Sequence, residues 1–153
     1  MGCAKKDHMR IDSPAFKDGT AIPDRYTCFG KNKIPPLRFE EVPEDAQSLA
    51  LIVEDPDAPA GTFTHWVLFN LDPQIRDIRE GVVPLKANQG TNDFGGIHYD
   101  GPKPPSGEHR YCFKAFAVDA ILPLSNGAGR GDVERELDGH VIDSAILVGT
   151  YAR

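Results

Sequence analysis

The stretch Ser48-Leu49-Ala50-Leu51-Ile52-Val53 holds the longest apolar run of the sequence, and it ends just before Asp55-Pro56. A short apolar run that ends in β-branched residues and lies between an acidic loop and a proline is typical of a buried β-strand. It is also far shorter than the ~20 apolar residues that a transmembrane helix needs. We therefore predict a buried strand here and no membrane-spanning segment.

Similar short apolar segments, separated by Pro and Gly, recur along the chain and favour a mainly β protein. Further strands are predicted at His65–Leu71, Arg110–Val118 and Ala145–Tyr151, with short edge strands within Phe16–Tyr26 and at Leu37–Phe39. The expected fold class is therefore mainly β, with a largely antiparallel sheet.

One helix is predicted, in which Asp132 caps Val133–Asp138 and Gly139 ends the helix. The glycine-containing segment Gly127–Gly131 before it is expected to be a flexible, exposed link.

The chain has 153 residues, which is the size of one domain. We expect residues 1–10 to form a flexible N-terminus and residues 11–153 to form a single domain. The net charge of −6 argues against a nucleic-acid-binding protein, but it leaves room for a local anion pocket.

The N-terminus lacks the apolar region of a secretory signal, so we expect a cytoplasmic protein. Met1-Gly2-Cys3 could suggest lipidation, but Lys6 stands where a myristoylation signal has Ser or Thr. The odd number of cysteines and the lack of a CxxC motif predict no zinc site. A disulfide between Cys28 and Cys112 stays open beside the simpler interpretation of free thiols.

The first candidate for chemistry is Asp55-Pro56-Asp57-Ala58-Pro59, followed by His65-Trp66. Two prolines keep this segment out of a central strand and hold two carboxylates in a stiff loop at a strand end. His65 begins the next strand and can return to the same end, where a carboxylate could orient its ring. The alternative is an ordinary proline-shaped turn beside a strand-end histidine, with Trp66 in the core.

The second candidate is the long loop from Gly90 into the strand that begins near His109. Such a long loop in a compact domain is usually functional or disordered, and its aromatic and proline residues favour order. His109 and Tyr111 are two residues apart and therefore share one face of a strand, while Arg110 and Cys112 take the other. We further expect an exposed backbone N–H at Gly101.

Together, His65, His109, Tyr111 and the Gly101 amide would form a compact set of hydrogen-bond donors suited to phosphate, sulfate or carboxylate. Asp55 is expected to support a histidine rather than to touch the anion. Simpler structural roles are expected for other polar residues: a loop position for His98, packing or capping for His140, and an ion pair of Arg110 with Asp57.

These motifs resemble the phosphatidylethanolamine-binding protein family, also called the Raf kinase inhibitor protein family, and most of all its prokaryotic branch. The resemblance rests on Asp55-Pro56-Asp57-Ala58-Pro59, His65-Trp66, Gly101-Pro102-Lys103-Pro104-Pro105 and His109-Arg110-Tyr111. Ile22-Pro23 to Thr27, Pro35-Pro36-Leu37, Gly90-Thr91-Asn92-Asp93 and the segment from Gly139 to the end add to it.

The resemblance implies a large central antiparallel sheet, a smaller second sheet and one or two short helices. It also implies an anion pocket for phosphate-type groups at one end of the sheet, lined by Asp55, Pro59, His65, Gly101, Pro105, His109 and Tyr111. Three departures from the family pattern concern the pocket rim: the short spacer between Pro105 and His109, and the residues Asp100 and Lys103. The long C-terminal helix of eukaryotic members is expected to be missing, because the chain stops at Arg153.

Three functions follow as hypotheses. The first is a non-enzymatic protein that binds a phospholipid head group or another phosphorylated ligand and acts as a regulator, with neither a cofactor nor a metal. The second is an acid–base hydrolase that uses the His, Asp and Tyr cluster. The third is an inhibitor of a protein kinase or protease through surface loops, for which Gly127–Gly131 and Pro104-Pro105 are the candidates. A homodimer is a further expectation from prokaryotic relatives.

Overall fold

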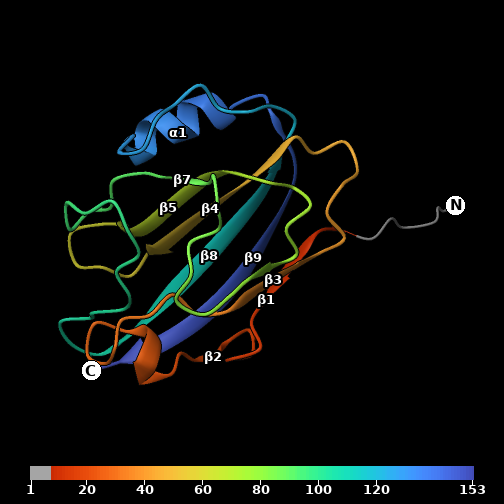
Figure 1. The fold of residues 1–153 in the computed structure, drawn as a ribbon. Helices are drawn as coiled ribbons and strands as arrows, with labels where there is room; N and C mark the ends of the chain where they lie inside the picture. Colours follow the sequence, from red (N-terminus) through yellow and green to blue (C-terminus); the bar gives the residue numbers. More distant parts are fainter. Residues whose placement is uncertain (1–7) are drawn as a thin grey trace, which may run out of the picture.

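The computed structural model describes residues 8–153 and has two β-sheets and one α-helix arranged in layers (Figure 1). The larger sheet has six strands in the order β2-β9-β8-β4-β5-β7, and the smaller has three in the order β1-β3-β6. The strands are β1 (Arg10–Asp12), β2 (Thr20–Ala21), β3 (Leu37–Glu40), β4 (Ser48–Asp55), β5 (Phe63–Leu71), β6 (Asp77–Ile78), β7 (Asn88–Gln89), β8 (Glu108–Val118) and β9 (Val141–Ala152). The helical segments are η1 (Asp24–Tyr26) and α1 (Arg130–Leu137). The predicted mainly β fold is confirmed.

The centre of the larger sheet is β8, which pairs antiparallel with β4 on one side and with β9 on the other. Because side chains alternate along a strand, Tyr111, Phe113 and Ala115 face the core between the two sheets. The intervening side chains, such as Lys114, lie on the opposite face. The parallel pairing of β2 with β9 is an exception in the sheet, which is otherwise antiparallel.

Two apolar layers hold these elements together. The larger layer fills the space between the sheets and includes Trp66, Phe39 and Leu147. The smaller lies between the large sheet and α1, where Val133 and Leu137 of the helix pack against the sheet. The helix therefore covers the face of the large sheet that is turned away from the small sheet (Figure 1).

The predicted strands are present, but several limits differ. β8 and β9 begin earlier than expected, at Glu108 and Val141. Within Phe16–Tyr26 only Thr20–Ala21 is a strand, and a short 3-10 helix follows it. β1 begins at Arg10, and Met9 before it is already buried.

The predicted helix start is wrong. α1 begins at Arg130, after Gly129 at the N-cap position, so Asp132 lies within the first turn and does not cap the helix. The predicted end is confirmed, because Gly139 adopts a left-handed conformation with φ of 81° just beyond α1.

The segment before α1 is not the exposed link that the sequence suggested. The N–H of Gly127 donates to the carbonyl of Gln89 at 2.8 Å. The N–H of Thr91 donates to the carbonyl of Ala128 at 2.9 Å, and the Thr91 hydroxyl donates to the Gly127 carbonyl at 2.8 Å. These bonds fasten residues 127–128 to β7 and to the loop that follows it.

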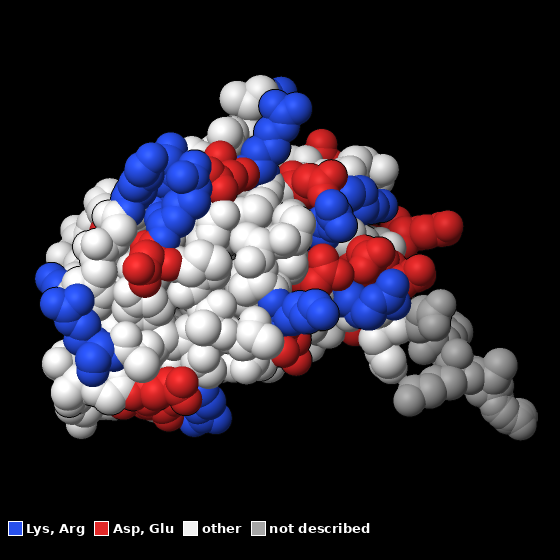
Figure 2. Space-filling view, turned by 90° about the horizontal axis from the view of Figure 1, so that it is seen from below, with Lys and Arg blue, Asp and Glu red and all other residues white. Residues whose placement is uncertain are grey.

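Charged side chains on the face seen in Figure 2 are mixed in sign, with Lys and Arg lying beside Asp and Glu around an area without charges. Among residues 8–153, no helix is long and apolar enough to cross a membrane. The lipidation pattern at Met1-Gly2-Cys3 and Lys6 lies outside the described residues.

Neighbouring residues of β9 provide a test of this layering. Leu147 is buried in the core, whereas Ile146 is 55% exposed on the other face. We expect Leu147→Ala to lower the free energy of unfolding by about 2–5 kcal/mol, and Ile146→Ala by less than about 1 kcal/mol. Denaturant unfolding of both variants measures the difference, and equal losses would contradict the assigned register of β9.

Candidate functional site

Asp55 and His109 meet where β4 ends beside the start of β8. The Nδ1 atom of His109 lies 2.6 Å from Oδ2 of Asp55, and both side chains are buried, with 9% and 5% exposed. The other carboxylate oxygen of Asp55 accepts the backbone N–H of Asp57 at 2.8 Å, so the proline-containing turn after β4 holds the carboxylate in place. Because Asp55 accepts hydrogen bonds on both oxygens, it orients His109 and fixes the proton on Nδ1.

His65 reaches the same end of the sheet from β5. Its Nδ1 lies 2.7 Å from the backbone carbonyl oxygen of Asp100, and its own carbonyl accepts the Asp100 N–H at 3.3 Å. Because a carbonyl can only accept, the Nδ1 atom of His65 carries the proton. Burial lowers the pKa of His65, although the Asp100 carbonyl and the charge of Asp55 oppose this effect.

Tyr111 lies between the two histidines. Its ring centroid is 5.3 Å from that of His65 in an edge-on arrangement, and 6.5 Å from that of His109 in a stacked one. The Tyr111 hydroxyl is buried and has no partner at hydrogen-bond geometry among the described residues, although the Lys103 backbone N–H and the Asp55 carboxylate lie near enough to influence its pKa. Burial, followed by the charge of Asp55, raises the pKa of Tyr111, so the hydroxyl keeps its proton and can donate it in a hydrogen bond.

Six of the seven predicted site residues divide into two groups. Asp55, His65, His109 and Tyr111 form one buried cluster. Pro59 and Pro105 are exposed on the loops that follow β4 and precede β8, where they border this end of the sheet.

The expectation of an exposed amide at Gly101 is wrong. The Gly101 N–H donates to Oδ1 of Asn32 at 2.7 Å, so the protein itself already uses this donor. A Cβ atom at this position would lie 2.1 Å from the carbonyl oxygen of Tyr26. Glycine is needed here because two backbone segments cross closely.

Asn92 organises the loop that carries Asp100. Its side-chain amide donates to the carbonyl of His98 at 2.9 Å and to Oδ2 of Asp100 at 3.0 Å, while its Oδ1 accepts the N–H groups of Phe94 and Gly96 at 2.9 and 3.0 Å. Asn32 donates to the other Asp100 oxygen at 3.1 Å.

Neither asparagine was a predicted site residue. Both hold Asp100, whose carbonyl in turn holds His65. For Asn92, the sequence offered one signal: it lies in a glycine-rich loop, and asparagine side chains commonly form hydrogen bonds with nearby backbone groups.

Two further aromatic side chains pack against His65. The ring centroids of Phe63 and Phe94 lie 5.3 and 5.4 Å from that of His65. Phe94 is 43% exposed, so it forms an apolar rim beside the cluster.

The other singled-out residues have mostly structural roles. Arg110 forms the expected ion pair with Asp57 at 2.8 Å, and this arginine holds the pKa of Asp57 down to about 2. Trp66 is in the core, as expected. His98 lies on the loop and is exposed. His140 is also exposed and pairs with Asp119 at 2.8 Å, and its N–H donates to the carbonyl of Leu137, the last residue of α1, at 2.9 Å. Of the two roles expected for His140, capping is confirmed and packing is wrong.

Cys28 and Cys112 are both free thiols, so the disulfide that the sequence left open is not formed. Burial raises the pKa of each thiol. Among residues 8–153, no group of three or more His, Cys, Asp or Glu side chains could hold a metal ion.

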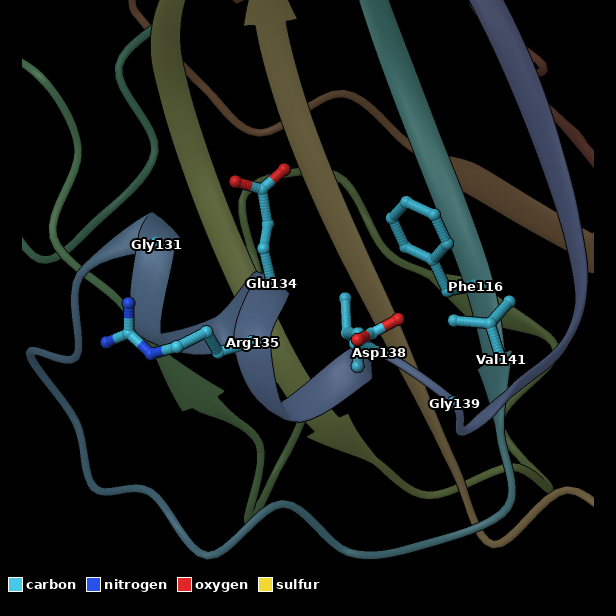
Figure 3. A pocket seen from close by; sticks show the side chains of 8 residues that line it. Phe116, Gly131, Glu134, Arg135, Asp138, Gly139 and Val141 are labelled. Atoms are coloured by element: carbon cyan, nitrogen blue, oxygen red, sulfur yellow. The ribbon is translucent and has the colours of Figure 1, made fainter.

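A separate groove of about 560 Å³ lies between α1 and the strands β8 and β9 (Figure 3). Its lining combines apolar side chains such as Phe116 and Val141 with Glu134, Arg135 and Asp138. These three charged residues are exposed, so this groove lacks the buried polar groups of the histidine cluster. The cluster is therefore the better candidate site.

Comparisons with known proteins identify relatives of this chain. A family profile described as phosphatidylethanolamine-binding protein matches residues 12–152. A UPF0098 protein from Methanothermobacter thermautotrophicus is 47% identical over 150 residues, which cover 95% of this chain and 99% of the relative. A UPF0098 protein from Aquifex aeolicus is 45% identical over 152 residues, covering 95% and 89% of the two chains.

Two solved structures have the same fold. A phosphatidylethanolamine-binding protein homolog from Chlamydia trachomatis is 41% identical, with a TM-score of 0.93 and coverage of 97% of this chain and 99% of the other. Escherichia coli YbcL, described as a member of the mammalian PEBP family, is 28% identical, with a TM-score of 0.90 and coverage of 96% and 99%.

Two glycines provide a test of the backbone crossing. In Gly101→Ala the added methyl group would meet the Tyr26 carbonyl, so we expect a loss of about 3 kcal/mol in the free energy of unfolding. Gly131→Ala is the control, because this helical glycine has open space around it and should gain about 0.5–1 kcal/mol. An undestabilised Gly101→Ala variant would rule out the close crossing.

The buried His65 predicts a pH dependence of stability. Its pKa in the folded protein lies below the ordinary value of about 6.5 that holds in the unfolded chain. The unfolded chain therefore binds more protons below pH about 6.5, and this residue makes the free energy of unfolding fall as the pH drops further. We expect His65→Gln to remove part of that fall in denaturant unfolding between pH 7.5 and 5, whereas His98→Gln, at an exposed position, should not. Identical pH profiles for both variants would refute a buried neutral His65.

Proposed function

Because the chain belongs to the phosphatidylethanolamine-binding protein family, we propose that it binds a small anion of the phosphate type at the cluster of Asp55, His65, His109 and Tyr111. The anion would be carried by a phospholipid head group or another phosphorylated ligand, and the protein would act as a non-enzymatic regulator.

The observation that carries the proposal is the Tyr111 hydroxyl, which is buried without a partner. A buried polar group that lacks a hydrogen bond costs about 1–3 kcal/mol, and native proteins contain few of them. An anion that accepts this O–H would satisfy the hydroxyl. Its position between two histidine rings adds groups that can also bind oxygen atoms.

The negative charge of Asp55 would oppose an anion if the carboxylate were free. Here both of its oxygens accept hydrogen bonds, one from His109 and one from the Asp57 backbone. The carboxylate therefore orients the His109 ring, and its own oxygens are already engaged in hydrogen bonds within the protein.

Binding is favoured over catalysis because no activated nucleophile accompanies the cluster. Cys28 lies on the adjoining loop, but burial raises the pKa of its thiol and so keeps it protonated. The Asp55–His109 pair is the one observation that favours the alternative of acid–base hydrolysis, because it resembles a base held by a carboxylate. Turnover of phosphate esters by the purified protein would favour that alternative.

Tyr111→Phe tests the proposal because it removes only the hydroxyl. We expect the binding of phosphate or phosphoethanolamine, measured by titration calorimetry, to weaken by about tenfold. The free energy of unfolding without ligand should not fall, because the lost hydroxyl had no partner. Tyr26→Phe is the control: its hydroxyl donates to Glu80 at 2.7 Å, so it should bind the anion normally. An unchanged affinity in Tyr111→Phe, or no saturable binding to the natural chain, would refute the proposal.

A further inference from the structure

We propose that the part of the large sheet beside α1 is a docking surface for a basic, amphipathic helix of a partner protein. This surface, called here the β8–β9 face, consists of Phe116, Val141, Ile142 and Ile146. It lies on the side of the large sheet opposite to Tyr111, which faces the core between the two sheets. The inference is therefore independent of the proposed function at the histidine cluster.

The helix α1 covers only one part of this side of the sheet. The apolar layer beneath it includes Ala50 of β4 together with Val67 and Phe69 of β5. Among residues 8–153, no residue of β9 belongs to that layer. The outer side of β9 therefore has no helix above it.

The side chains left uncovered are mostly apolar. Ile146 is 55% exposed, Val141 41% and Ile142 36%. The ladder pairs Phe116 of β8 with Ser144 of β9, so Phe116 is a diagonal neighbour of both isoleucines. A contiguous apolar patch on a protein surface commonly marks an interaction site.

The shape of this region suits a helix. The groove of about 560 Å³ runs between the strands, at Phe116 and Val141, and the last turn of α1 at Leu137 (Figure 3). What is uncovered is a face of the sheet rather than its edge, and α1 already shows how a helix covers such a face. A second helix would lie beside α1 and place an apolar stripe, repeating every three to four residues, on the isoleucines.

The wall that α1 presents to the groove is acidic. Residues 130–138 carry two arginines against four acidic residues, a net charge of −2. Figure 3 shows Asp138 on the side of α1 nearer to Phe116 and Val141, whereas Arg135 extends away from them. Positive charges on the partner would therefore meet a complementary surface, which favours a basic helix.

The cations near this surface are already paired within the protein. Lys114 lies 2.9 Å from Glu54, Arg130 also pairs with Glu54, and Arg135 pairs with Asp132. In contrast, the ion pairs found among residues 8–153 do not include Asp138.

The end of α1 adds to this negative charge. Leu137, its last residue, lines the groove, and the carboxyl end of a helix carries a partial negative charge that attracts cations. A second copy of this chain is a poorer occupant than a basic helix, because it would bring two acidic faces together.

Two synthetic peptides test the chemistry of the partner. The first, of about 18 residues, has leucines at helical spacing on one face and lysines on the other, and the second has glutamate in place of each lysine. In fluorescence anisotropy titrations with the full chain at low salt, we expect saturable binding of the lysine peptide and at least about tenfold weaker binding of the glutamate peptide. The difference should shrink at high salt. Equal binding of both peptides at low salt, or no binding of the lysine peptide, would overturn the proposal.

Variants place the binding on the β8–β9 face. Ile146→Ser should weaken the lysine peptide by at least about tenfold, and this exposed position tolerates the change without unfolding. Asp138→Asn should reduce the preference for the lysine peptide over the glutamate peptide. The control is Ile121→Ser, which changes an isoleucine that is 62% exposed but does not line the groove, and it should bind normally.

Three results would contradict the assignment of this surface. One is an Ile146→Ser variant that binds the lysine peptide as tightly as the natural chain, and another is an equal loss in Ile121→Ser. The third is a dimer of the natural chain in analytical ultracentrifugation that Ile146→Ser dissociates, because a second copy would then cover the face. Tyr111→Phe should leave peptide binding unchanged, so a failure of the proposed anion site would not affect this test.

Discussion

The pairing of β8 between β4 and β9 is the constraint on which the site depends. In this register Cys112 lies opposite Glu54, and His109 and Tyr111 share the face that looks toward Asp55. A shift of one residue would turn both side chains to the opposite face, because side chains alternate along a strand. The ladder is long and its inner face is buried, with Phe113 fully enclosed, so such a shift would place polar groups in the core.

The same alternation gives the two acidic residues at the end of β4 different environments. Asp55 faces the histidine cluster, whereas Glu54 faces α1 and receives hydrogen bonds from Arg130 and from Lys114, the latter at 2.9 Å. Burial alone would raise the pKa of Glu54, but these two cations lower it overall. Arg130 also donates to the hydroxyl of Thr64, next to His65, so the start of α1 is fixed to the strand that carries the site.

The sequence predicted which residues share a face of a strand or lie at its end. It did not predict contacts between segments that are far apart along the chain. Alternation placed His109 beside Tyr111, and the proline-containing turn placed Asp55 at a strand end. At the start of α1, Arg130 meets Glu54, a contact that no pattern near residue 130 reveals. Likewise, the Gly101 amide was expected to be free because Asn32, its partner, lies 69 residues away along the chain. The family motifs supplied the architecture that periodicity alone left open.

The cluster also shows why net charge is a poor guide to a local group of buried polar side chains. The chain carries a charge of −6, yet the carboxylate nearest to the cluster is held by His109 and by a backbone N–H. At a buried position, the direction of each donor and acceptor matters more than the sum of distant, screened charges. Leaving the Tyr111 hydroxyl unpaired lowers the stability of the free protein, and a ligand that accepts it would restore that stability through binding. The unpaired Tyr111 hydroxyl is therefore the observation on which the proposed anion ligand rests.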